Sequence, residues 1–182
     1  MLIKFKNHSP KLGQNVFVAE GAKIIGEIEI GDESSIWFNC VLRADVNFIK
    51  IGKRTNIQDL STVHVWHREF DEKGKLKDAG FPTIIGDDVT IGHNCVIQAC
   101  VIKNRVLIGM NAVIMDNALI EEDSIVGAGS VVTKGKKFPP RSLILGNPAK
   151  FVRELNDEEI SFLKQSALNY MDFKNEFLKD LQ

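Results

Sequence analysis

Residues 83–132 read TIIGDDVTIGHNCVIQACVIKNRVLIGMNAVIMDNALIEEDSIVGAGSVV, with an aliphatic side chain at almost every sixth position. The same period extends back to Val18, with a slip after Phe48, a gap at residues 66–82 and a five-residue step before Ile102. The series is Val18, Ile24, Ile30, Ile36, Leu42, Phe48, Ile51, Ile57, Val63, Ile85, Ile91, Ile97, Ile102, Ile108, Ile114, Ile120, Val126 and Val132. Such a period fits neither an amphipathic helix nor a simple alternating strand.

A six-residue period is typical of a parallel β-helix, in which each hexapeptide supplies a short strand and a corner. Three hexapeptides, about 18 residues, form one triangular coil, and neighbouring coils stack about 4.8 Å apart. Four places after most aliphatics comes a small or branched residue: Ala22, Ser34, Cys40, Thr55, Ser61, Cys95, Ala112, Ala118, Ser124 and Ser130. The alternative is a β-sandwich with accidental spacing, which so many in-phase positions disfavour. We therefore expect an all-β solenoid.

Composition and charge restrict the surroundings of the chain. Its 182 residues suffice for one sizeable core, and 26% of them are charged with a net charge of −1, which indicates neither nucleic acid nor an anionic membrane as a partner. We expect no signal peptide and no membrane span. Three cysteines are an odd number, and Cys40 and Cys95 fall on inward positions. The sequence therefore predicts reduced thiols in a cytoplasmic protein.

The predicted solenoid occupies residues 1–150. Residues 1–17 are expected to form a lead-in strand and turn that cap the first coil. Residues 66–82, WHREFDEKGKLKDAGFP, break the repeat and are expected to leave the stack as a loop. Because this loop directly follows His64, we expect it to border a binding site on that side of the solenoid.

A C-terminal helix packed on the solenoid is expected within residues 151–182. Asn156 and Glu159 have the spacing of a capping box at its start. A helically spaced apolar stripe follows, comprising Ile160, Leu163, Ala167, Tyr170, Met171, Phe177, Leu178 and Leu181. This stripe is suited to cover either its own chain or a neighbouring one.

Residues 41–65 carry an unusual set of outward polar side chains: Arg43, Asp45, Asn56, Gln58, Asp59 and His64. A solvated face with a surface ion pair is the ordinary interpretation. The register of the repeats favours a metal site instead. If the loop rejoins in phase, Gln98 lies one coil above His64, close enough for both to ligate one metal ion. Asp59 and His93 then share a different face, so His93 could join His64 only from a neighbouring chain.

Three segments, RADVNFIKIGKRTNIQDLSTVH (43–64), TIGHNCVIQAC (90–100) and GNPAKFVR (146–153), resemble the gamma-class carbonic anhydrase family of the hexapeptide-repeat superfamily. The resemblance covers nearly the whole chain. Its NIQD…H and IGH elements are specific, whereas the hexapeptides and GNPAK are shared with acyltransferases. It implies a left-handed parallel β-helix, since hexapeptide families depart from the right-handed crossover rule. It also implies a homotrimer that hydrates carbon dioxide to bicarbonate by metal-hydroxide chemistry, with Zn²⁺ or Fe²⁺ at the subunit interfaces.

The family's site residues can be carried over position by position. Two of its three metal-binding histidines correspond to His64 and His93, and the third position is Gln98. The arginine–aspartate pair that joins subunits corresponds to Arg43 and Asp45. The residues around the bound water and the cleft correspond to Asn56, Gln58, Asp59 and Tyr170.

Glutamine at position 98 departs from the family, because an amide is a weaker zinc ligand than imidazole. Three outcomes are open: Gln98 binds through its carbonyl oxygen or a water, His67 replaces it, or the site has lost its metal and its chemistry. Val46 also stands where the family has a proton-transfer glutamate. A second proton-transfer glutamate of the family lies in an acidic loop that does not align clearly with this chain, and Glu69, Asp71 and Glu72 are conceivable substitutes for it.

Two other functions compete with the hydration of carbon dioxide. The hexapeptide stack and GNPAK are shared with acyltransferases that use acetyl-CoA, although no acceptor pocket or catalytic histidine signature of those enzymes is recognisable. A non-catalytic trimeric scaffold is the third hypothesis, in which the protein keeps the trimer after losing the third histidine.

Overall fold

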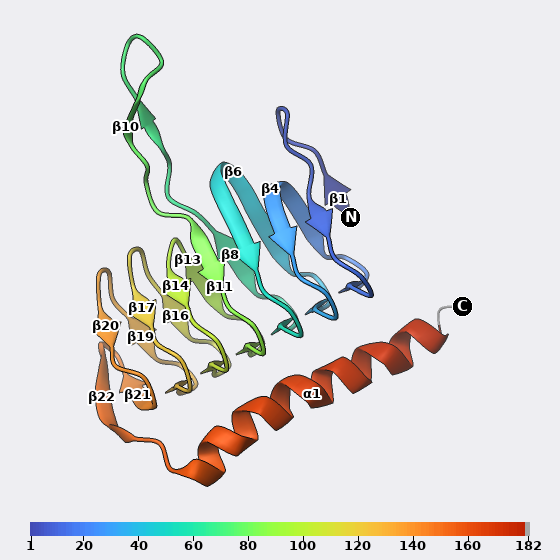
Figure 1. The fold of residues 1–182 in the computed structure, drawn as a ribbon, viewed down its shortest axis with the longest axis vertical. Helices are drawn as coiled ribbons and strands as arrows, with labels where there is room; N and C mark the ends of the chain where they lie inside the picture. Colours follow the sequence, from blue (N-terminus) through green and yellow to red (C-terminus); the bar gives the residue numbers. More distant parts are fainter. Residues whose placement is uncertain (181–182) are drawn as a thin grey trace.

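The computed structural model describes residues 1–180, which form a parallel β-solenoid with a C-terminal helix, as the sequence predicts (Figure 1). The eight-stranded sheet contains β3 (Phe17–Val18), β5 (Ser35–Ile36), β7 (Asn56–Ile57), β12 (Thr90–Ile91), β15 (Leu107–Ile108), β18 (Ile125–Val126), β21 (Ser142–Gly146) and β22 (Ala149–Glu154). The twelve-stranded sheet contains β1 (Leu2–Ile3), β2 (Lys11–Leu12), β4 (Lys23–Ile30), β6 (Val41–Ile51), β8 (Thr62–His64), β11 (Thr83–Ile85), β13 (Val96–Gln98), β14 (Val101–Ile102), β16 (Val113–Ile114), β17 (Leu119–Ile120), β19 (Val131–Val132) and β20 (Lys137–Phe138). A separate hairpin contains β9 (Glu69–Phe70) and β10 (Leu76–Asp78), and the helix is α1 (Asp157–Asp180).

The twelve-stranded sheet covers two faces of the solenoid, because β4 and β6 each run continuously around a corner. The first part of β6 pairs with β8 and its last part with β11. The eight-stranded sheet forms the remaining face. Strands of successive coils pair in parallel, for example Ile91 with Ile57 and Ile108 with Ile91, whereas the last strand, β22, pairs antiparallel with β21.

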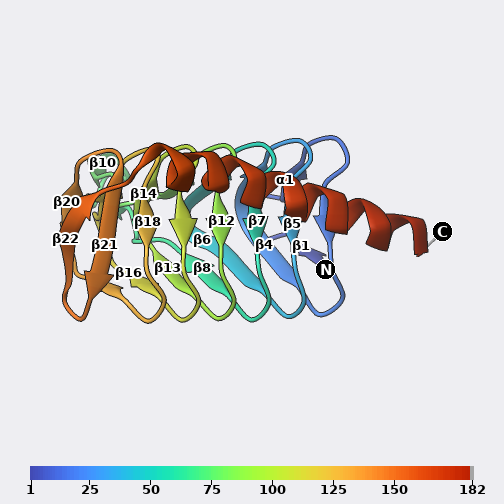
Figure 2. The ribbon, with the colours of Figure 1, turned by 90° about the horizontal axis from the view of Figure 1, so that it is seen from below.

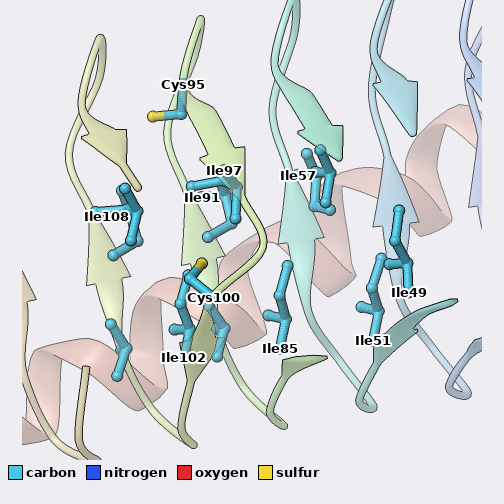
Figure 3. Packing of buried hydrophobic residues seen from close by; sticks show 14 of the residues in the cluster. Ile49, Ile51, Ile57, Ile85, Ile91, Cys95, Ile97, Cys100, Ile102 and Ile108 are labelled. Carbon is cyan, nitrogen blue, oxygen red and sulfur yellow. The ribbon is translucent and has the colours of Figure 1, made fainter. Parts of the chain in front are cut away.

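The predicted inward aliphatics form stacked columns in the core (Figure 3). Ile57, Ile91 and Ile97 are 0% exposed, and burying each such side chain contributes roughly 1.5–3 kcal/mol. The small positions are buried as well, and hydroxyls at two of them bond the next coil: Ser34 Oγ donates to the Gly52 carbonyl at 2.8 Å and Thr55 Oγ1 to the Gly86 carbonyl at 2.8 Å. The side chains at these positions are small because the corner holds little space.

The prediction that Phe48 belongs to the inward series is wrong. Ile49, 1% exposed, occupies the core position, while Phe48 is partly exposed under the Arg68 guanidinium. The cause is a bulge: Gly26 pairs with Ala44 and Ile28 with Ile49, so β6 holds four residues where β4 holds one. The bulge shifts the phase of the repeat.

The interpretation of residues 1–17 as a cap also needs correction. β1 and β2 pair with β4, and β3 pairs with β5, so this segment forms most of a coil itself. Only the short turn at Phe5 and His8, whose backbones bond each other, leaves the stack.

Residues 66–82 leave the solenoid as the β9–β10 hairpin (Figure 1). The Trp66 amide donates to the Phe81 carbonyl at 2.8 Å and closes the neck of the hairpin. Asn47, 2% exposed, lies in the β6 bulge and donates through Nδ2 to the Trp66 carbonyl at 3.0 Å and the Ala79 carbonyl at 2.8 Å. One buried amide thus holds both arms of the neck.

Helix α1 crosses the eight-stranded sheet of its own chain (Figure 2). The predicted capping box is present, since Asn156 Oδ1 accepts from the Glu159 amide at 2.8 Å and Glu159 Oε2 accepts from the Asn156 amide at 2.9 Å. Leu163 and Ala167 of the stripe are buried, whereas Phe177 is exposed. Leu181 lies outside the described residues. Within residues 1–180 no helix has the length and apolar character needed to cross a membrane.

The neck contacts predict the effect of Asn47→Ala. Removing both amide bonds costs about 1–3 kcal/mol of local stability, since two carbonyls lose their donor. Hydrogen exchange should show the Trp66 amide exchanging roughly tenfold faster or more. Asn7→Ala, at an exposed asparagine, is the matched control. Unchanged Trp66 exchange would show that the neck does not depend on Asn47.

Candidate functional site

His64 and Gln98 are neighbours on one face of the solenoid. Strand β8 pairs with β13 so that His64 lies opposite Gln98, which confirms the register expected from the repeat. Gln98 Nε2 donates to the Val65 carbonyl at 3.2 Å, so its carbonyl oxygen faces away from that bond. The backbone carbonyl of His64 accepts from the Thr83 hydroxyl. Two potential ligands, an imidazole and an amide oxygen, are therefore adjacent.

Asp45 and Arg43 fix the imidazole of His64. Its Nε2 lies 3.0 Å from Asp45 Oδ1, and Arg43 Nη1 donates to Asp45 Oδ2. Burial alone would raise the pKa of Asp45, but the hydrogen bond from His64 and the charge of Arg43 lower it overall. Asp45 therefore stays ionised near neutral pH and can accept a proton-bearing nitrogen of His64.

His93 belongs to another part of the surface. It follows β12, and its Nδ1 lies 2.7 Å from Asp59 Oδ2, as expected from the shared rung. Asp59 Oδ1 also accepts from the Phe38 amide at 3.1 Å, which fixes the carboxylate. Within residues 1–180 no three His, Cys, Asp or Glu side chains lie close enough together to hold a metal ion. One chain alone therefore provides no complete histidine site.

Asn56 and Gln58 belong to a buried hydrogen-bonded chain. Gln58 Nε2 donates to Asn56 Oδ1 at 3.1 Å, and Asn56 Nδ2 donates to Thr90 Oγ1 at 2.9 Å. Thr90 Oγ1 in turn lies 3.1 Å from the Ser166 hydroxyl of α1. Thr90 and Ser166 are not among the site residues predicted from the sequence. The register could have indicated Thr90, because it pairs with Asn56, but no sequence signal connects Ser166 to it.

Tyr170 of α1 lies near Asp59 and lines one pocket together with Gln58 and His93. Burial, and secondarily the Asp59 charge, raise the pKa of its hydroxyl, so Tyr170 stays protonated at neutral pH. Its ring meets Trp37 edge-on with ring centroids 5.6 Å apart. The helix thus brings its tyrosine to the face that carries His93.

His67 lies at the base of the hairpin, with its ring against Trp66 and Nε2 3.6 Å from Glu69 Oε1. It lines a pocket with Asp45 and Val46. Asp71 and Glu72 lie further out on the exposed hairpin. The structure therefore brings together His64 with Gln98, and His93 with Gln58 and Tyr170, as two separate groups.

Comparison with known proteins gives consistent matches. The family model for dynactin subunit 5 matches residues 12–175. A mitochondrial gamma carbonic anhydrase 2 of Arabidopsis thaliana is 43% identical over 171 residues, covering 94% of this chain and 59% of that protein. A carbonic anhydrase of Geobacillus kaustophilus is 39% identical over 182 residues, covering 100% of this chain and 93% of that protein.

The structure of a hexapeptide transferase family protein from Anaplasma phagocytophilum superposes with a TM-score of 0.88 at 39% identity, covering 97% of this chain and 98% of that one. The chain spans about three fifths of the length of the Arabidopsis relatives. The chain therefore belongs to the dynactin subunit 5 family as that model defines it and, by its relatives, to the gamma carbonic anhydrase family of hexapeptide-repeat proteins.

Proposed function

We propose that this protein is a gamma carbonic anhydrase that interconverts carbon dioxide and bicarbonate at a metal site between subunits of a homotrimer. The observation that supports this most directly is the His64–Gln98 rung, with His93 held by Asp59 on a separate face. A metal site shared between two copies needs two neighbouring ligands from one copy and a histidine from the other. The relatives named carbonic anhydrase support the reaction.

The residues present fit a divalent metal ion in their donor chemistry. Gln98 has its NH₂ group on the Val65 carbonyl, which leaves the amide oxygen free to ligate. His93 has Nδ1 on Asp59, which leaves Nε2 free, and ligating histidines commonly use their second nitrogen in this way. His64 would ligate through Nδ1, or through Nε2 after leaving Asp45. Bound Zn²⁺ or Fe²⁺ would supply Lewis-acid activation of water, which zinc achieves near pH 7.

The remaining side chains would position the substrate, the metal ligands and the neighbouring subunit. Gln58, fixed through Asn56 and Thr90, presents an amide edge that can hydrogen-bond an oxygen of carbon dioxide or bicarbonate. Asp59 holds the tautomer of His93. Arg43 and Asp45 lie beside His64, where a neighbouring copy would approach.

Proton transfer would depend on the β9–β10 hairpin. Val46 cannot carry a proton, and it is exposed on the β6 bulge. Glu69 lies near His67, which itself lines a pocket with Asp45. We propose that this pair moves protons between the site and solvent, more slowly than a carboxylate at position 46 would.

The ligand assignment predicts the effect of Gln98→His. Imidazole is the better zinc ligand, so zinc affinity should rise about ten- to hundredfold, measured by competition with a chelating dye. Met115→His places a histidine one coil further along the same face and is the matched control, which should not raise zinc affinity. If neither the wild type nor Gln98→His binds zinc, the ligand assignment is wrong.

The shared site predicts complementation between two defective chains. His64→Ala and His93→Ala should each bind no metal, because each lacks a ligand at every interface. Co-refolded mixtures should regain metal, since a mixed trimer contains one interface with both histidines intact. Metal content of the mixed trimer, isolated with two different affinity tags, is the measurement. Mixed trimers without metal would contradict a site between subunits.

A non-catalytic scaffold is the second candidate. Glutamine at position 98 and the match to a family model named for dynactin, a multi-subunit assembly, favour it. Under this alternative the trimer persists in strong chelator, measured by light scattering, and no added metal produces carbon dioxide hydration. The hydration proposal predicts activity with added zinc or ferrous iron.

An acyltransferase is the third candidate, supported by the hexapeptide transferase relative. Stabilisation by coenzyme A in a thermal-shift assay would favour it over hydration.

A further inference from the structure

Four buried polar side chains connect helix α1 to the proposed hydration site. They are Gln58, Asn56, Thr90 and Ser166, none of which is more than 8% exposed. Gln58 and Asn56 belong to one coil and Thr90 lies opposite Asn56 on the next, whereas Ser166 comes from α1. Hydrogen bonds join them in one row, which runs from Gln58 through Asn56 and Thr90 to Ser166.

The direction of each hydrogen bond in this row follows from its neighbours. The NH₂ group of Asn56 faces the Val89 carbonyl at 3.4 Å and Thr90 Oγ1 at 2.9 Å, so Thr90 Oγ1 accepts from Asn56. A hydroxyl has one proton, and Ser166 Oγ, 3.1 Å away, is the remaining partner of the Thr90 hydroxyl among the described residues. Ser166 is therefore the acceptor at the end of the row.

The same directions decide which end of the Gln58 amide faces the cleft. Asn56 directs Oδ1 at Gln58, so Gln58 donates through Nε2 and keeps Oε1 for another partner. Within residues 1–180, Asp116 Oδ1 is the only buried side-chain oxygen or nitrogen without a partner, so Gln58 Oε1 is open to the cleft that Gln58 lines with Tyr170. An acceptor there suits a ligand oxygen that carries a proton, such as the hydroxyl of bicarbonate or a water molecule.

Loss of the Ser166 hydroxyl would favour the reverse orientation of the row. The proton of Thr90 would have no acceptor, and a buried donor without a partner is costly. If both amides turned round, Thr90 could donate to Asn56 Oδ1, and Asn56 could donate to Gln58 Oε1. The turn sacrifices only the 3.4 Å bond to the Val89 carbonyl, which is longer than the usual range of about 2.7–3.2 Å. That carbonyl keeps the backbone amide of Asn56 at 2.9 Å.

We propose that Ser166 and Thr90 are positioning residues that make Gln58 present its amide oxygen, rather than its NH₂ group alone, to the reacting ligand. This inference rests on the proposed hydration function, because it concerns the orientation of Gln58 at that site. It gives helix α1 a part in the reaction, since the hydroxyl that attaches the helix to the sheet also sets the direction of the row.

The kinetic test measures carbon dioxide hydration by the zinc-loaded full-length protein. Ser166→Ala should lower kcat/KM about tenfold, whereas Ser166→Thr keeps the acceptor and should stay within about twofold of wild type. The added methyl group has space, because Ser166 lines a pocket of ≈ 470 Å³. Ser161→Ala, the same change at an exposed serine of α1, is the matched control and should leave kcat/KM unchanged. Equal losses in Ser166→Ala and Ser166→Thr would overturn the proposal.

A double variant separates positioning from packing. Thr90→Val should lower kcat/KM less than Ser166→Ala does, because it removes the proton that drives the turn, and Val89 still holds the Asn56 NH₂ group. Adding Ser166→Ala to Thr90→Val should then have no further effect. The double variant would thus be more active than Ser166→Ala alone, which damaged packing cannot produce. A double variant less active than both single variants would contradict the positioning role.

Hydrogen exchange of the side-chain amides, resolved by NMR in the presence of a strong chelator, is the readout that needs no metal. In wild type Asn56 Oδ1 holds one Gln58 Nε2 proton, which should exchange at least about tenfold faster in Ser166→Ala. Ser166→Thr and Ser161→Ala should keep the wild-type rate. Unchanged Gln58 exchange in Ser166→Ala would overturn the proposal. If every variant and the wild type lacked hydration activity, the proposed function would fail, but the exchange rates would still decide the orientation of Gln58.

Discussion

Every feature of this protein depends on the stacking of each coil on the one before it. The inward aliphatic of one coil must lie over that of the previous coil, and each strand must bond the strand one spacing away, or core and backbone pairing are lost together. The constraint extends across the β9–β10 hairpin, where Thr83 pairs with Ile49 and Ile85 with Ile51. A long excursion is tolerated because its neck is closed by Asn47 and returns the chain in register. The position of Gln98 beside His64 is a direct consequence.

The stack also separates the polar groups onto different faces. His64 and Gln98 lie on the twelve-stranded sheet, whereas Gln58 and Asp59 follow a strand of the eight-stranded sheet, with His93 on the next coil. Each group is fixed by buried or half-buried partners, because polar atoms removed from water need hydrogen bonds. Asp45, which fixes His64, is available because the β6 bulge adds residues at that corner. The same bulge supplies Asn47, so one irregularity serves both the site and the hairpin neck.

Helix α1 covers part of the outer surface of the eight-stranded sheet. It is attached by the Thr90–Ser166 hydroxyl pair, by the aromatic contacts of Trp37 with Tyr170, and by Lys174, which is 0% exposed and bonds Glu33 Oε2 at 2.7 Å. That contact is the main reason why the pKa of Glu33 is lowered. A buried ammonium is tolerable only when paired in this way. Between the helix and the sheet lies the pocket that Gln58, His93 and Tyr170 line.

The sequence by itself determined the periodic part of this protein. Six-residue spacing specified the solenoid, the inward columns and the small buried corner residues, and counting across the gap placed Gln98 over His64 and His93 beside Asp59. All of these features follow from a repeat in which each of the six positions has a preferred kind of side chain. Only the tertiary structure decided the rest: that Ile49 replaces Phe48, that residues 1–17 form most of a coil, that Lys174 is buried, and that Thr90 bonds Ser166. Those features depend on how irregular segments and the helix meet the stack, and contacts between residues so far apart in the chain leave no period in the sequence.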